Sequence, residues 1–235
     1  MNIVDIIILV FIVLSAFVGF SRGFFKQTIM FVGTILVICL SFIFKNPLSL
    51  FMYKNLPFFK FGGLTSLNIL LYEILAFIIL IVVLSIVLVI LVKITGIVEK
   101  ILKATIILAI PSKLLGMLVG IIESIVILYF ALFILSLPII KVPYLNESKY
   151  AKIIMNKTPI LSSVCDNIMK TFDEISEFTE ENLKLNFDVN KANKDILEII
   201  LKNRVATSDN VRYLVEKDKI KIDNVNELLE MYEEG

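Results

Sequence analysis

The sequence predicts an all-α fold: a polytopic membrane helical bundle of about four transmembrane helices with a short interfacial helix, followed by a soluble helical tail. Hydrophobic residues make up 58% of the 235 positions and the mean hydropathy is +0.90, whereas soluble domains are roughly 45 to 50% apolar. Charge is also uneven, because residues 1–140 carry only nine of the 23 Lys and Arg and four of the 22 Asp and Glu. We therefore expect a membrane domain over residues 1–140 and a soluble α-helical tail over residues 141–235.

Four apolar runs are long enough to cross a bilayer. The hydrocarbon core is about 30 Å thick and needs roughly 20 apolar residues in a helix. The predicted spans are about residues 3–20, 24–44, 69–92 and 114–137, and each contains a single charged residue. Only Ser21, Arg22 and Gly23 separate the first two spans, which predicts a tight helical hairpin.

The two longer connections differ in character. Residues 45–68 contain Pro47, Pro57, two adjacent glycines and several aromatic residues, which predicts a loop lying against the lipid headgroups. Residues 97–108 place apolar side chains at helical spacing and charged side chains on the opposite face, which predicts an interfacial helix. Pro111 then ends this helix before the fourth span.

The tail is expected to be helical. Thr158 and Pro159 have the signature of a helix start, and a helix over about residues 160–182 would carry one apolar stripe: Leu161, Val164, Ile168, Phe172, Ile175 and Phe178. This stripe forms either the core of the tail or a docking face for a protein partner. Three shorter helices are expected at roughly residues 191–203, 209–217 and 224–232, the last two capped by Ser208 and Asp223.

The composition excludes several function classes. The chain has no histidine, which excludes Ser-His-Asp and Cys-His catalysis and histidine-ligated zinc. Its two cysteines are too few and too far apart for a disulfide framework or a thiolate metal site. A net charge of +1 without a basic stripe gives no basis for nucleic-acid binding. We expect no enzymatic activity, no cofactor and no metal.

Acidic residues inside the spans are the first candidates for function, because a carboxylate in hydrocarbon is costly and usually faces a partner or a water path. Glu123 lies about 10 residues into the fourth span, near the middle of the membrane. It either is protonated or hydrogen-bonded within the bundle and serves helix association, or lines a proton or solute path. Asp5 and Glu73 lie near span ends, close to headgroups and water, and carry less weight.

Small residues mark two helix faces. Gly116, Gly120 and Ser124 share one face of the fourth span with Glu123, and Gly19 and Gly23 share one face of the first span with Arg22. Glycines at this spacing allow backbones to approach closely, so we predict that the two faces meet. Arg22 then either extends toward Glu123 or remains among the headgroups.

Short motifs resemble a known family. Val4-Asp5 before an apolar span, Gly19-Phe20-Ser21-Arg22-Gly23-Phe24-Phe25 after it, and Lys113-Leu114-Leu115-Gly116-Met117-Leu118-Val119-Gly120 at the fourth span are similar to the colicin V production protein (CvpA) family. The resemblance covers roughly residues 1–160 and ends near Ser148-x-Tyr150. Ser112 and Ser124 depart from the pattern, and the extension after about residue 165 is not covered.

The resemblance implies a bacterial inner-membrane protein linked to colicin V production or toxin export and to envelope homeostasis, without enzymatic activity. Two alternatives stay open: an oligomeric channel or small-solute or proton transporter using Glu123, and a membrane anchor for a partner bound by the tail. The partners we expect are the lipid bilayer, a second copy of the chain, and a protein bound through residues 160–182. Lys and Arg near the spans number six on one side and seven on the other, so the positive-inside rule does not orient the chain. The resemblance implies a tail outside the cytoplasm.

Overall fold

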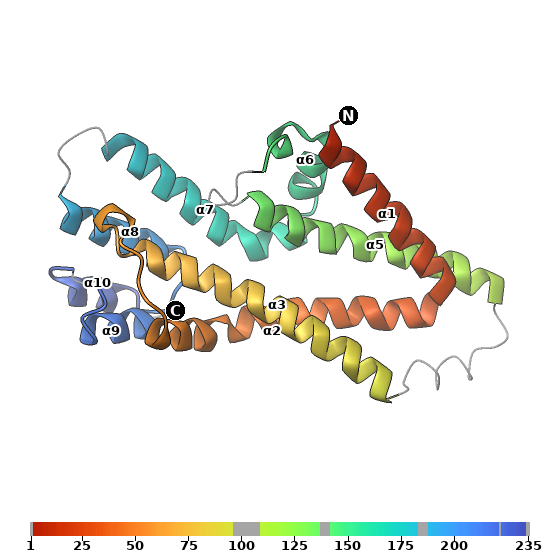
Figure 1. Ribbon diagram of the computed structural model, residues 1–235, viewed down its shortest axis with the longest axis horizontal. Helices are drawn as coiled ribbons and strands as arrows, with labels where there is room; N and C mark the ends of the chain where they lie inside the picture. Colours follow the sequence, from red (N-terminus) through yellow and green to blue (C-terminus); the bar gives the residue numbers. More distant parts are fainter. Residues whose placement is uncertain (1, 96–108, 137–141, 183–187, 221, 234–235) are drawn as a thin grey trace. The chain divides into compact units, whose positions relative to one another are not determined.

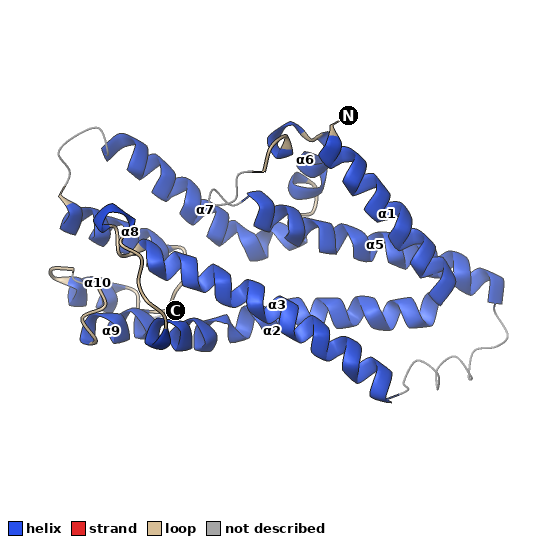
Figure 2. Cartoon of the chain, in the orientation of Figure 1, coloured by secondary structure: helices blue, strands red, loops and turns tan. Residues whose placement is uncertain are grey.

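The computed structural model of the chain describes residues 2–95, 109–136, 142–182, 188–220 and 222–233. These residues form nine α-helices and two short 3-10 turns, with no strand among them (Figures 1 and 2). The predicted all-α fold is therefore confirmed. The predicted interfacial helix at residues 97–108 lies outside the described residues.

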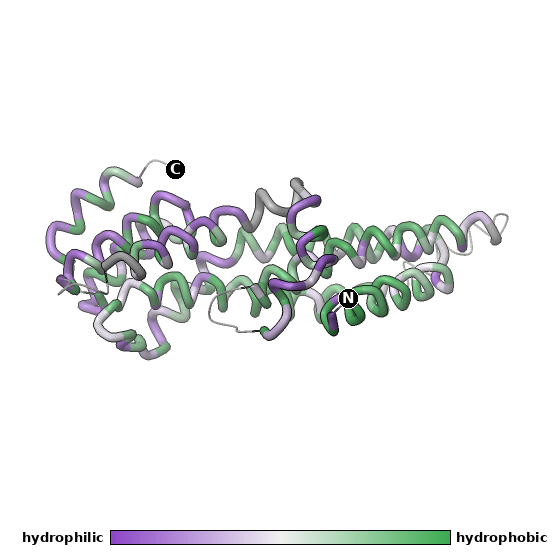
Figure 3. Tube along the Cα trace, turned by 90° about the horizontal axis from the view of Figure 1, so that it is seen from above, coloured by the Kyte–Doolittle hydropathy of each residue, from purple (hydrophilic) through white to green (hydrophobic). Residues whose placement is uncertain are grey.

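Among the described residues, four helices are long and apolar enough to cross a membrane, as predicted. They are α1 (Ile3–Arg22), α2 (Phe24–Asn55), α3 (Leu67–Thr95) and α5 (Ala109–Ser136). Hydrophobic residues dominate most of their length, whereas the later helices alternate between hydrophobic and hydrophilic residues (Figure 3). The chain is a multi-pass membrane protein.

The turn between α1 and α2 contains a single residue outside the two helices. Gly23 ends α1 with φ of +76°, a backbone conformation that favours glycine, and its N–H donates to the Gly19 carbonyl. The α2 helix begins at the next residue. The predicted tight hairpin is thus one glycine long.

The predicted loop at residues 45–68 is partly helix. The α2 helix continues to Asn55 with Pro47 inside it, followed by a short 3-10 turn at Phe61–Gly63. A proline normally interrupts a helix, because it lacks the N–H and its ring clashes with the preceding turn. Here Lys45, Ser49 and Tyr53, four residues apart on one face, all find buried partners. These tertiary contacts override the local signal of the proline.

The chain divides into two compact units. Unit 1 contains residues 1–39 and 83–165, and unit 2 contains residues 40–82 and 166–235. Both α2 and α3 contribute one part to each unit. The predicted boundary between residues 140 and 141 follows hydropathy instead of contacts, and it stays a prediction.

In the described part of the chain, five helices and one 3-10 turn follow the last span. The turn is Leu145–Glu147, and the helices are α6 (Lys149–Asn156), α7 (Pro159–Asn182), α8 (Val189–Lys202), α9 (Ser208–Glu216) and α10 (Val225–Met231). The predicted start of α7 at Pro159 is confirmed. Side chains of its apolar stripe at Ile168, Phe172 and Ile175 are buried, while the predicted partner for this helix stays a prediction.

Both predicted caps in the tail were wrong. Thr207, not Ser208, caps α9 by accepting from the Asn210 N–H, because the Ser208 hydroxyl donates to the Tyr232 carbonyl instead. The N-terminal position of α10 is Asn224, not Asp223. Asp223 is used elsewhere, as its carboxylate accepts from the Asn190 side chain.

Candidate functional site

Glycines bring α1 and α5 of unit 1 into backbone contact. A Cβ atom placed on Gly19 would lie 2.3 Å from the Gly116 carbonyl oxygen, and one on Gly120 would lie 2.5 Å from the Ser15 carbonyl oxygen. Gly116 also lies against Gly23. No larger residue fits this contact without movement of the backbone. The structure therefore places the two predicted glycine faces together (Figure 1).

The last predicted packing residue, Ser124, makes its hydrogen bond within α5. It is buried, and its hydroxyl donates to the Ile121 carbonyl at 2.7 Å. This side chain is satisfied without a partner from another helix. A role for these residues beyond packing stays a prediction.

Glu123 lies on α5 and accepts hydrogen bonds from α2. The Gln27 amide donates to Glu123 Oε2, and the Thr34 hydroxyl lies 2.9 Å from Glu123 Oε1. The glutamate is only 8% exposed. Glu123 therefore joins two membrane helices through a neutral amide and a neutral hydroxyl.

Arg22 is linked to Glu123 through Gln27 and not directly. Its Nη1 atom donates to Gln27 Oε1 at 3.3 Å, and the amide nitrogen of the same Gln27 donates to Glu123. The chain of contacts begins at the end of α1 and continues to a position twelve residues after Pro111, roughly 18 Å along α5 at about 1.5 Å per residue. A charged group at a span end is thus connected to a carboxyl deep in the span.

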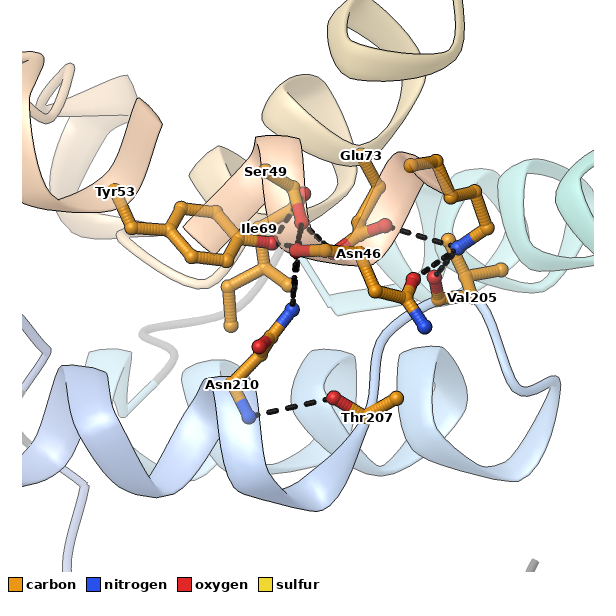
Figure 4. A network of polar contacts seen from close by, with 9 residues as sticks. Asn46, Ser49, Tyr53, Ile69, Glu73, Val205, Thr207 and Asn210 are labelled. Carbon is orange, nitrogen blue, oxygen red and sulfur yellow. Dashed lines mark hydrogen bonds and ion pairs between the residues drawn. The ribbon is translucent and has the colours of Figure 1, made fainter. Parts of the chain in front are cut away.

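Glu73 of α3 has a different environment in unit 2 (Figure 4). It is 1% exposed and forms an ion pair with Lys45 of α2, with 2.9 Å between Nζ and Oε2. Its other oxygen accepts from the Ser49 hydroxyl at 2.5 Å and from the Tyr53 hydroxyl at 2.9 Å. The carboxylate is paired with a cation and fully hydrogen-bonded, the condition under which a buried charge is tolerated.

Lys45 also binds the tail. Its ammonium group donates to the Val205 carbonyl at 2.6 Å and to Asn46 Oδ1 at 2.8 Å, in addition to Glu73. Three acceptors satisfy the three N–H groups of the lysine. Because Val205 lies between α8 and α9, the buried lysine joins the α2–α3 hairpin to the tail helices.

The turn that presents the Val205 carbonyl has a defined form. Arg204, two residues after the end of α8 at Lys202, lies in the left-handed region at φ of +54°, and the Arg204 and Val205 N–H groups donate to the Leu201 and Ile200 carbonyls. This is a Schellman motif with arginine at the position that favours glycine. The backbone strain there accompanies the contact that Val205 makes with Lys45.

Two asparagines add further contacts between hairpin and tail. The Asn210 amide of α9 donates to the Asn46 carbonyl at 3.2 Å and to the Ser49 hydroxyl at 3.3 Å. Asn193 of α8 accepts from the Ser66 N–H at 2.9 Å and donates to the Gly63 carbonyl at 2.9 Å. The tail is therefore held by hydrogen bonds along both the helical and the loop part of the hairpin.

Asp5 joins the start of α1 to the start of α6. It forms a capping box with Asn2, and one of its oxygens accepts from the Ser148 hydroxyl at 2.6 Å and from the Tyr150 N–H at 3.1 Å. Ser148 is itself the N-cap of α6. The contacts made by Asp5 are those of a residue that fixes helix ends.

The sequence analysis missed five side-chain partners of Glu123 and Glu73: Gln27, Thr34, Lys45, Ser49 and Tyr53. All lie on α2. Their spacing in the sequence indicates shared helix faces, because Gln27 and Thr34 are seven residues apart and Lys45, Ser49 and Tyr53 are four residues apart.

Within the described part of the chain, no group of three or more Cys, Asp or Glu is arranged to hold a metal ion.

Comparison with known proteins identifies the membrane part of the chain. A family model described as colicin V production protein matches residues 4–159. No curated protein and no solved structure shows significant similarity to the chain. The match covers α1 to α6 with the Asp5, Glu73 and Glu123 clusters, and it ends where α7 begins.

Proposed function

This chain belongs to the colicin V production protein family, and on that premise we propose that it is a non-enzymatic scaffold of the bacterial inner membrane. In this role its spans hold the tail helices at the membrane surface, where they assist production or export of a colicin-type toxin and help to maintain the envelope. The tail lies on the side outside the cytoplasm. In export, the chain acts together with a partner protein that the tail binds.

The contact between Lys45 and the Val205 carbonyl is the observation that carries the proposal. A flexible tether would leave the tail free to move away from the hairpin, whereas a hydrogen bond from a buried lysine, itself ion-paired within the hairpin, fixes the tail. Removal of a single partner from such a network leaves an unpaired buried group, which is costly. Rigid presentation of a helical domain is the property that a scaffold requires.

A second function, transport, is favoured by the chain of contacts from Arg22 through Gln27 to Glu123. Polar residues of this kind inside membrane spans often mark ion or proton pathways. Four spans are too few to enclose a wide path, so a transporter would require several copies of the chain.

Toxin secretion in a strain that lacks its own family member distinguishes the two functions. Glu123→Gln retains the shape of the side chain and removes its ability to bind and release a proton, whereas Asn210→Leu removes the hydrogen bonds of the tail to Asn46 and Ser49. The scaffold predicts normal secretion with Glu123→Gln and reduced secretion with Asn210→Leu. The opposite pattern, with membrane insertion of both variants verified, would show that transport is the function.

A further inference from the structure

We propose that Glu123 is a proton-binding site inside the membrane, and that its proton exchanges with water on the side of the α1–α2 turn. The proposal concerns unit 1 alone and does not depend on a scaffold function. It rests on the chemical nature of the groups around the two buried glutamates, on the depth of Glu123 in its span, and on the position of Arg22.

The partners of Glu123 suit a neutral acid. A carboxylate only accepts hydrogen bonds, whereas a protonated carboxyl group must also donate one. A glutamine amide and a threonine hydroxyl each donate and accept, so Gln27 and Thr34 can serve both forms of Glu123. By contrast, the ammonium group of Lys45 only donates and carries a positive charge, so its contact with Glu73 favours the carboxylate over the neutral acid.

Among the described residues, no cation contacts Glu123 directly. Every ion pair formed by the described residues lies in unit 2, and Lys45–Glu73 is the buried one. An isolated carboxylate in hydrocarbon is costly, and in practice such a group becomes neutral. For Glu123, which is buried within a span, a proton therefore takes the place that Lys45 has beside Glu73.

Arg22 provides a reason for exchange rather than permanent protonation. Its positively charged guanidinium group contacts the same Gln27 amide that binds the carboxyl group. When the proton leaves, this positive charge stabilises the remaining carboxylate through a short chain of hydrogen bonds. Because Arg22 is the last residue of α1, the exchange occurs at the end of the bundle where α1 meets α2.

The side chains packed around the site define what else can titrate. From α1 the charged neighbour is Arg22, from α2 the neighbours are the neutral Gln27 and Thr34, and on α5 the nearest described charge toward the same end is Lys113. The Lys113 ammonium group lies 5.8 Å from the centre of the Phe20 ring. Among these groups Glu123 is the acid, so a carboxyl signal from this region reports Glu123.

Infrared spectroscopy of the full-length protein in lipid bilayers at neutral pH tests the proposal, because a protonated carboxyl group has a C=O stretching band that a carboxylate lacks. We expect this band in the wild-type protein, its loss in Glu123→Gln and its retention in Glu73→Gln. Absence of the band from the wild-type protein, or its persistence in Glu123→Gln, would overturn the proposal.

A second pair of variants keeps the test valid if Glu123→Gln does not fold. Thr34→Val removes a hydroxyl that contacts Glu123, whereas Thr28→Val removes one that donates only to the Phe24 carbonyl of its own helix. Loss of a hydrogen bond stiffens a carbonyl, so the band should move to higher frequency in Thr34→Val and remain in place in Thr28→Val. An unshifted band in Thr34→Val would contradict the assignment to Glu123.

A separate measurement tests the route by which the Glu123 proton exchanges with water. Transfer of the protein to D₂O shifts the acid band as deuterium replaces the proton. Gln27→Leu removes the link between Arg22 and Glu123, and it should slow this shift relative to wild type. Ser124→Ala, which changes a neighbouring buried hydroxyl bound to its own helix, should not. Equal exchange rates in Gln27→Leu and wild type would exclude access through Gln27.

Discussion

Unit 2 places a buried carboxylate beside a lysine, whereas unit 1 places a buried carboxyl group among neutral donors. Glu73 contacts the Lys45 ammonium group at 2.9 Å, and Glu123 contacts the Gln27 amide and the Thr34 hydroxyl. The comparison teaches that burial of a glutamate does not define its role. The partner that balances the charge, a fixed cation or an exchangeable proton, separates a structural pair from a site that can respond to its surroundings.

The helices around the two glutamates are joined by different forces. In unit 1, α1 and α5 meet at glycines, with backbone atoms in contact. In unit 2, the hairpin and the tail helices meet through the hydrogen bond from Lys45 to the Val205 carbonyl and through asparagine side chains. Close packing of small residues is the usual solution between helices in lipid, whereas a polar network suits a boundary with water. The two halves of α2 thus contribute to two kinds of interface.

Loss of Lys45 should have the largest effect. Lys45→Met leaves Glu73 buried without its cation, and breaking a buried pair costs roughly 3 to 5 kcal/mol. We expect unfolding in detergent at a lower denaturant concentration and faster proteolytic removal of the tail. In the double variant Lys45→Met with Glu73→Gln, no charge remains unpaired, so it should be more stable than the single variant. If the single variant is as stable as wild type, the contacts of Lys45 do not hold the tail.

Enlargement of the glycine contact should have the next largest effect. Gly19→Ala places a Cβ atom against the Gly116 backbone, and overpacking of this kind costs about 1 to 3 kcal/mol. The matched control is Val13→Ile, which adds a methyl group on α1 at a side chain that is 65% exposed. In thermal unfolding in detergent, Gly19→Ala should have a lower midpoint temperature than Val13→Ile. Equal stability would mean that α1 and α5 tolerate separation at this contact.

Loss of one neutral hydrogen bond at Glu123 should have the smallest effect. Thr34→Val removes the hydroxyl near Oε1, and a single hydrogen bond contributes about 0.5 to 1.5 kcal/mol. Thr28→Val provides the reference for the change in side-chain type on the same helix. The free energy of unfolding should differ between the two variants by no more than this amount. A difference as large as that of Lys45→Met would indicate that Glu123 carries a full charge.

Hydropathy predicts the four spans, and the spacing of the glycines predicts the contact between their two helix faces. Both signals are local, because they depend on composition and helical periodicity. The length of α2 was not predictable in this way. Pro47 and the following aromatic residues resemble a loop, and the helix persists because Lys45, Ser49 and Tyr53 bind residues distant in the chain. The sequence around these residues carries no local signal of such long-range contacts, except that the three polar residues are spaced four apart.

The candidate residues show the same limit. Glu123 and Glu73 stood out because carboxyl groups are rare in apolar runs, but their relative weight depended on partners that lie far away in sequence. The sequence predicts a loop at the headgroups around Lys45 and gives no signal for Gln27, since a single amide or lysine near a span end is unremarkable. The Val205 carbonyl could not be predicted, because a backbone group has no signature in the sequence.

The stability of Glu73→Gln against Glu123→Gln tests the central contrast most directly. Both variants exchange a carboxyl group for an amide of the same shape, and both would be measured by denaturant unfolding of the full-length protein in detergent micelles. Glu73→Gln leaves the Lys45 ammonium group without a carboxylate, and we expect a loss of roughly 3 to 5 kcal/mol. Glu123→Gln mimics a protonated acid, so its stability should stay within about 1 kcal/mol of wild type. Equal losses in the two variants would contradict the assignment of a fixed ion pair to one glutamate and a proton to the other.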